Sequence, residues 1–136
     1  MQNKKINQQK VLVSTMYRFL ETLQVKQFTK KDLEQFYTSN VKMIINDQLV
    51  ARDINEFFEH FKLMAAKPCK YLLVFDENPM ITEEKRLAIQ YKIEMYGQQK
   101  IIMYSMVFFT FSDDKICLWN QLVSTVSATE MQLTHQ

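Results

Sequence analysis

The order of the elements in this sequence predicts an α+β fold, with helices packed on one face of a bent sheet. The first half of the chain repeats its apolar residues at helical spacing, and the second half alternates them at strand spacing. Short polar turns separate the strands of the second half. A chain of 136 residues fits one domain. We expect that domain over residues 10–126, with a flexible polar tail at 1–9 and another tail at 127–136.

Three helices are expected in the first half of the chain. The first begins at Lys10, where apolar residues start to recur at helical spacing. The second begins at Thr29, which caps it, with Asp32 completing a capping box three residues later. The third, residues 53–65, is the clearest, because Asp53 caps it, Glu56 completes its box and one face carries the apolar stripe Ile54, Phe57, Phe58, Phe61, Met64 and Ala65. Pro68 is expected to end it.

Strands follow the second and third helices. Residues 41–50 are extended, with a turn at Asn46 and Asp47. Residues 70–75 form a short strand, and residues 86–96 alternate cleanly between apolar and polar. Tight turns then join two long strands, 101–111 and 116–126. The strand 101–111 is apolar on both faces, so something must cover each of them.

The composition excludes several classes of function. Basic residues exceed acidic ones by only 17 to 15, which argues against a nucleic-acid partner. The chain has one glycine, Gly97, and therefore no Gly-rich phosphate loop. No apolar run approaches the roughly 18 residues of a membrane span, so no membrane association is expected. The spacing of Cys69 and Cys117 fits neither a metal site nor a redox motif. We therefore expect reduced thiols in a cytoplasmic protein, with a disulfide between Cys69 and Cys117 as the alternative. No acid or histidine follows His60 at metal-ligand spacing, so neither a metal nor a cofactor is expected.

Three stretches carry a resemblance to a known superfamily. They are a helix followed by a strand, a helix that begins after an Arg-Asp pair, and a hairpin, which read "LEQFYTSNVKMI", "ARDINEFFEHF" and "FFTFSDDKICLWNQL". Over residues 10–126 the chain resembles the nuclear transport factor 2-like superfamily, and within it the SnoaL-like group. In the hairpin, Asp114 stands where the family has a turn glycine.

The resemblance implies a cone-shaped, curved antiparallel or mixed sheet with the three helices on its concave face. Such a cone surrounds an apolar pocket, faced by one side of the strand 101–111 and, on the next strand, by Cys117, Trp119, Gln121 and Val123. The implied ligand-binding residues are Tyr17, Tyr91, Ser105, Val107, Phe109, Trp119 and Gln121. The opposite side of the same strands is expected to be covered by a second copy of the chain in a homodimer, through Ile102, Tyr104, Met106 and Phe108. Cover by the C-terminal tail is the alternative.

The resemblance leaves catalysis open. Enzymes of the superfamily hold a carboxylate in the apolar cone, where burial raises its pKa. The corresponding places here carry Val107, the pair Ile44 and Ile45, and Gln121, none of which titrates. Asp47, near the first strand, is the remaining acid candidate. The function expected first is binding of a small apolar ligand. The alternatives are an isomerase, cyclase or dehydratase of a small hydrophobic substrate, and a non-catalytic interaction module with a filled cone.

Overall fold

The computed structural model describes residues 2–23, 27–67, 70–83 and 85–126. Its helices are α1 (Gln2–Glu21), α2 (Lys30–Leu33) and α3 (Ile54–Ala65). Its strands are β1 (Tyr37–Ile45), β2 (Gln48–Ala51), β3 (Lys70–Glu83), β4 (Arg86–Tyr96), β5 (Lys100–Ser112) and β6 (Lys115–Val126).

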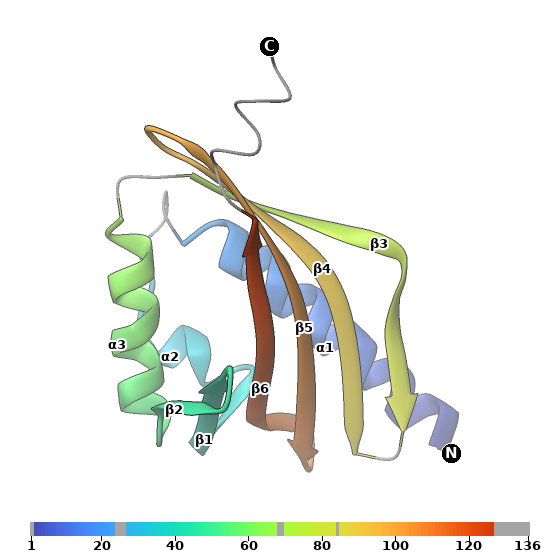
Figure 1. Cartoon of the computed structure of the whole chain (residues 1–136). Helices are drawn as coiled ribbons and strands as arrows, with labels where there is room; N and C mark the ends of the chain where they lie inside the picture. The colour runs from blue at the N-terminus through green and yellow to red at the C-terminus, as the bar shows by residue number, and fades with distance from the viewer. Residues whose placement is uncertain (1, 24–26, 68–69, 84, 127–136) are drawn as a thin grey trace.

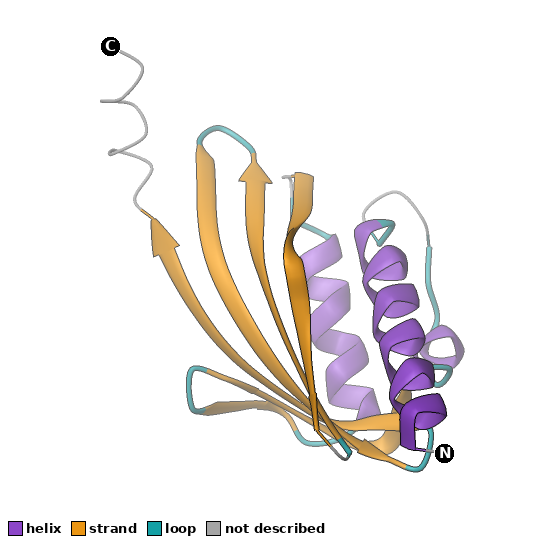
Figure 2. Ribbon diagram, turned by 90° about the vertical axis from the view of Figure 1, so that its right-hand side faces the viewer, coloured by secondary structure: helices purple, strands orange, loops and turns teal. Residues whose placement is uncertain are grey.

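One curved sheet holds all six strands, in the order β2-β1-β6-β5-β4-β3 (Figure 1). The β1–β6 pair is parallel and the other pairs are antiparallel. Figure 2 shows both long helices on one side of the curved sheet. The predicted α+β fold, with a mixed, cone-like sheet and helices on its concave face, is confirmed.

The N-terminal boundary of the domain was predicted wrongly. Residues 2–9 are not a separate tail, because α1 begins at Gln2 and Gln9 is buried. Gln9 lies one helical turn before Val13, so it shares the face that packs on the sheet. The segment is polar, but it contains no Pro or Gly, and its lysines and glutamines are good helix formers. The predicted C-terminal tail, residues 127–136, lies outside the described residues, as do Cys69 and Pro68.

The predicted turns are present, with one correction. Asn46 and Asp47 both have positive φ, 48° and 66°, as expected for a tight hairpin between β1 and β2. In the turn between β5 and β6 the positive φ, 56°, is at Asp113 and not at Asp114, where the family's glycine was aligned. Aspartate tolerates this region better than most residues.

A β-bulge changes one inward position of β6. Phe111 pairs with Ile116, and Thr110 pairs with Leu118, so Cys117 is the extra residue. Ile116 is therefore fully buried, whereas Cys117 is only partly buried and its Sγ donates to the Thr110 carbonyl at 3.5 Å. The prediction that Cys117 faces the concave side was wrong, because the bulge reverses the alternation at that point.

The two faces of β5 have the assignment that the resemblance implies. Ser105, Val107, Phe109 and Phe111 are buried on the concave side, and Tyr104 on the opposite side is 52% exposed. The core lies between these inward residues and α1, α3 and β1, and its fully buried side chains include Val13, Met16, Tyr37, Phe57 and Ile116.

Candidate ligand-binding cavity

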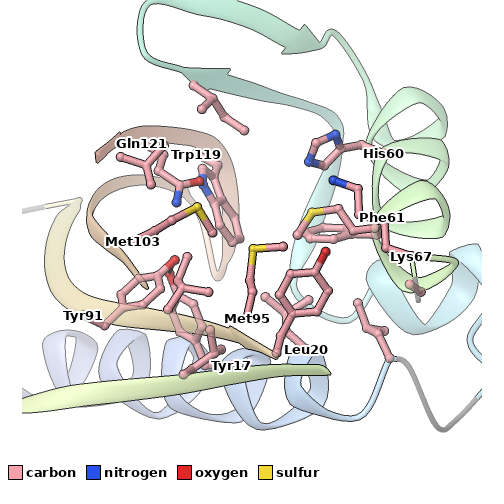
Figure 3. A pocket seen from close by; sticks show the side chains of 18 of the residues that line it. Tyr17, Leu20, His60, Phe61, Lys67, Tyr91, Met95, Met103, Trp119 and Gln121 are labelled. Atoms are coloured by element: carbon pink, nitrogen blue, oxygen red, sulfur yellow. Dashed lines mark hydrogen bonds between the residues drawn. The ribbon is translucent and has the colours of Figure 1, made fainter. Parts of the chain in front are cut away.

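The concave side of the sheet is packed solid at one end and hollow at the other. A cavity of about 450 Å³ lies where β4 turns into β5, between the sheet and helices α1 and α3 (Figure 3). Its apolar wall comprises Leu20, Leu23, Met43, Ile45, Phe61, Met64, Leu73, Ile93, Met95, Ile101 and Met103. Its polar contributors include Tyr17, His60, Lys67, Tyr91, Trp119 and Gln121.

Hydrogen-bonded polar side chains form the inner wall of the cavity. Trp119 Nε1 donates to Gln121 Oε1 at 3.1 Å, and Gln121 Nε2 donates to Ser105 Oγ at 2.7 Å. Ser105 in turn hydrogen-bonds Tyr91, which accepts from the Tyr17 hydroxyl at 3.1 Å. An indole N–H can only donate, so the amide oxygen of Gln121 must face Trp119 and its nitrogen must face Ser105. The orientation of the Gln121 amide is therefore determined by its neighbours.

The tyrosines of this network stay protonated at neutral pH. Burial raises the pKa of Tyr17 and of Tyr91, and the neighbouring Tyr91 raises the pKa of Tyr17 further. Both hydroxyls therefore act as hydrogen-bonding groups rather than as bases.

On the α3 side of the cavity, burial lowers the pKa of His60, and the positive charge of Lys67 lowers it further. His60 is thus uncharged at neutral pH.

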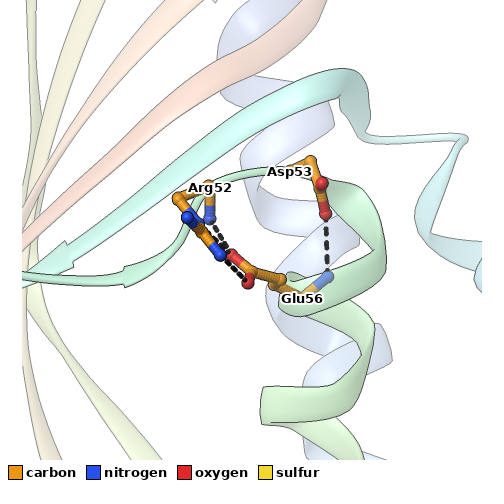
Figure 4. Close-up of polar contacts among 3 residues, drawn as sticks. All are labelled: Arg52, Asp53 and Glu56. Atoms are coloured by element: carbon orange, nitrogen blue, oxygen red, sulfur yellow. Dashed lines mark hydrogen bonds and ion pairs between the residues drawn. The ribbon is translucent and has the colours of Figure 1, made fainter.

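The start of α3 holds this side of the cavity in place. Asp53 Oδ1 accepts the Glu56 backbone N–H at 3.0 Å, as predicted for the cap (Figure 4). The Glu56 carboxylate binds Arg52 instead of the Asp53 backbone: it accepts from the Arg52 backbone N–H at 2.8 Å, from Nε at 3.1 Å and from Nη2 at 3.0 Å. These contacts begin the helix directly after β2, so that its inner face carries Phe61 and Met64 to the cavity.

Four of the seven predicted ligand-binding residues line the cavity: Tyr17, Tyr91, Trp119 and Gln121. Ser105 lies behind Gln121 as its hydrogen-bond partner and is 2% exposed. Val107 and Phe109 face the predicted side of the sheet but lie in the packed core and do not line the cavity. Phe109 packs edge-on against Trp119, with ring centroids 5.2 Å apart.

The sequence did not indicate Lys67 as a cavity residue, because it follows the end of α3, where no periodicity applies. His60, considered in the sequence only for metal-ligand spacing, also lines one side of the cavity. Four methionines of the wall, Met43, Met64, Met95 and Met103, come from four different elements. The alternation of the strand residues and the helical spacing of Met64 indicate which face of each element is buried. They do not indicate that a cavity lies against that face.

The acid candidate is not at the cavity. Asp47 is exposed in the turn between β1 and β2 and is not among the lining residues. Its neighbour Asn46 instead joins that turn to β6: Asn46 Nδ2 donates to the Val123 carbonyl at 3.1 Å, and the Val123 N–H donates to Oδ1 at 2.9 Å. No described residue that lines the cavity is an Asp or a Glu. Within the described ranges, no cluster of three or more His, Cys, Asp or Glu side chains could hold a metal.

No helix within the described residues is long and apolar enough to cross a membrane.

Solved structures with the same fold were found, although no protein-family model and no curated protein matches the sequence. A nuclear transport factor 2-like protein from Burkholderia xenovorans is 11% identical, with a TM-score of 0.66 over 96% of each chain. An LEH-like epoxide hydrolase of M. tuberculosis is 10% identical, with a TM-score of 0.63 over 83% of this chain and 82% of that one. A Jannaschia protein described as a SnoaL-like polyketide cyclase is 12% identical, with a TM-score of 0.61 over 89% of each chain. The fold that these proteins share with the chain is the one its element order predicts, and the chain has the nuclear transport factor 2-like fold.

Proposed function

We propose that this chain binds a small, largely apolar molecule in the cavity and works as a homodimer. The observation that carries the first part is a hollow of about 450 Å³ with a mostly apolar wall and a hydrogen-bonded inner end. A cavity of about 150 Å³ accommodates benzene, so this one has room for roughly 18 non-hydrogen atoms. This volume favours an open cone over the alternative of a filled interaction module.

Gln121 is the group best placed to orient the ligand. One N–H of its Nε2 is donated to Ser105, while the side chain remains part of the cavity wall. An amide nitrogen has a second N–H, which a ligand carbonyl or hydroxyl oxygen can accept. Trp119, which Gln121 holds through its indole N–H, offers an aromatic surface for the apolar part of the ligand.

The enzyme alternative lacks a supporting observation of its own. An isomerase, cyclase or dehydratase of the expected kind needs a carboxylate beside the substrate, and none of the described lining residues carries one. Structural neighbours include an epoxide hydrolase and a protein described as a polyketide cyclase, but their identity of 10–12% supports the fold and not the reaction.

Two neighbouring residues of α3 provide a test of ligand binding. Met64 lines the cavity, whereas Leu63 is 70% exposed. Apolar small molecules should stabilise the wild type by about 2.7 kcal/mol when present at about 100 times their Kd. Met64→Trp should fill the cavity and abolish that stabilisation, while Leu63→Trp should retain it. The readouts are thermal unfolding and titration calorimetry. Equal binding by both variants would place the ligand elsewhere.

The convex face of the sheet supports the homodimer. Tyr104 is 52% exposed, Phe108 is 43% exposed and Leu122, on the adjacent strand, is 48% exposed. Leu122 pairs with Met106, which lies between Tyr104 and Phe108 on the same face of β5, so these side chains form one apolar patch with Ile102 at its edge. Contiguous apolar patches on soluble proteins mark interaction sites, and a second copy offers an equally apolar surface.

Tyr104→Glu combined with Phe108→Glu tests the interface. We expect the mass measured by analytical ultracentrifugation to fall from that of a dimer to that of a monomer, because like charges would then face each other without water. Leu63→Glu, on the exposed face of α3, is the control and should leave the mass unchanged. A wild-type chain that sediments as a monomer would refute the proposed interface.

A further inference from the structure

The cavity has one charged side chain in its wall. Among its lining residues within the described part of the chain, Lys67 is the only Lys, Arg, Asp or Glu. Figure 3 shows the nitrogen atoms of Lys67 and His60 on the α3 side, across the cavity from Gln121 and Tyr91. The cavity is therefore polar at two opposite sides and apolar between them.

Among the described residues, no carboxylate forms an ion pair with Lys67. The ion pairs of this part of the chain join Arg52 to Glu56, Lys62 to Glu59, and both Lys92 and Lys100 to Glu94. Lys67 lies near enough to His60 for its positive charge to lower the pKa of the imidazole further, after burial. An ammonium group beside an apolar cavity attracts an anionic group and repels a cationic one.

The apolar wall suits a flexible chain. Four of its side chains are methionines, which are unbranched and adapt to irregular or mobile partners. A rigid ligand gains little from such a wall, whereas an acyl-like chain can follow it in several conformations.

We propose that the ligand is an amphipathic carboxylate, with a flexible apolar chain inside the cavity and its carboxylate against Lys67 and His60. This inference rests on the proposed ligand binding and specifies its chemical class. The carboxylate oxygens accept from Lys67 Nζ and from the imidazole N–H of His60. The chain length is limited by the roughly 18 non-hydrogen atoms that the cavity can hold.

Three ligands of equal chain length and different head group test the class: decanoate, decan-1-ol and decylamine. Trp119 is the only tryptophan of the chain and lines the cavity, so its fluorescence reports entry of the ligand. Titration calorimetry gives an independent affinity. Decanoate should bind about five times more tightly than decan-1-ol, the amount that a partly exposed ion pair contributes, and decylamine should bind most weakly.

Variants of two lysines isolate the contribution of Lys67. Lys67→Met should abolish the preference for decanoate over decan-1-ol, and Lys67→Arg should retain it. Lys70→Met, at the start of β3 and outside the cavity lining, makes the same change in net charge and should leave the preference intact.

The outcomes separate the inference from the function on which it rests. If decan-1-ol binds at least as tightly as decanoate, or if Lys67→Met keeps the preference, the head-group assignment is wrong although ligand binding stands. If none of the three ligands binds, both the assignment and the proposed function are refuted.

Discussion

Replacing Gln121 by leucine tests the hydrogen-bonded inner wall of the cavity most directly. The change keeps the size of the side chain and removes both its acceptor and its donor. Trp119 Nε1–H then loses the acceptor at 3.1 Å, and Ser105 Oγ loses the donor at 2.7 Å. Trp119 is 3% exposed, so its indole N–H has little access to bulk water.

The expected loss of stability follows from the number of groups left without a partner. An unsatisfied buried donor costs about 1–3 kcal/mol, and Ser105 keeps its second hydrogen bond, to Tyr91. The free energy of unfolding should therefore fall by about 2 kcal/mol, most of it from Trp119. For a chain of this size that corresponds to a decrease in Tm of roughly 6–10 °C.

Urea unfolding, followed by circular dichroism at one protein concentration, measures the loss. Gln48→Leu is the matched control: it makes the same change at an exposed position of β2, outside the cavity lining and the convex patch, and should alter stability by less than about 0.5 kcal/mol. Combined with Ser105→Ala, the Gln121 variant should show non-additivity of about 1 kcal/mol, since the two residues share a hydrogen bond. A Gln121→Leu protein with the wild-type midpoint and slope would mean that the network contributes nothing to stability.

Other expectations concern the core, the alkaline limit of stability and the turn between β1 and β2. Phe109→Ala should lower the free energy of unfolding by about 3–5 kcal/mol in urea, because the ring is 1% exposed and packs on Trp119; a loss below about 1 kcal/mol would contradict the filled core. The pKa of Tyr91 is raised in the folded protein, so the unfolded chain loses the phenolic proton at a lower pH. The contribution of Tyr91 to stability is therefore constant below a pH of about 10. Above that pH the free energy of unfolding falls by about 1.4 kcal/mol per pH unit for this group. Tyr91→Phe should reduce the alkaline slope by that amount, and an unchanged slope would show that Tyr91 ionises freely in the folded state. Asn46→Ala and Asn46→Gly both remove the hydrogen bonds to Val123, but only alanine is strained at a φ of 48°. Asn46→Ala should therefore lower the free energy of unfolding by about 1 kcal/mol more than Asn46→Gly. Equal unfolding midpoints of the two variants would rule out that strain.

Helices and strands that are determined by a few adjacent residues could be predicted from the sequence. The alternation over residues 86–96 coincides with β4, and the cap at Asp53 lies directly before α3. In both, a few adjacent residues determine the backbone: side chains of alternating polarity in β4, and a side-chain acceptor for free N–H groups in α3. The residues of β5 are apolar on both sides, so the side that faces the core was predicted from the resemblance and not from its own alternation.

Features that depend on contacts between distant residues were not predictable. The first turns of α1 look like a polar tail in the sequence, and only the structure shows that Gln9 is buried. One extra residue at Cys117 reverses the alternation of β6, and nothing in the local pattern marks it. Lys67 lies at the cavity because of the path the chain takes after α3, which no periodicity describes.

Alternation identifies which side of a strand is buried, but it does not say what fills the space opposite. Along β5 the inward residues Ile101 and Met103 line the cavity, whereas Val107 and Phe109 lie in a solid core. All four are apolar and share one face, so the difference comes from what packs against them. Phe109 meets Tyr17 of α1, with ring centroids 6.1 Å apart, and Tyr17 itself forms part of the cavity wall. The cavity therefore begins at the helical turn that carries Tyr17, and a larger side chain one turn further along α1, at Leu20, should reduce its volume without disturbing the sheet.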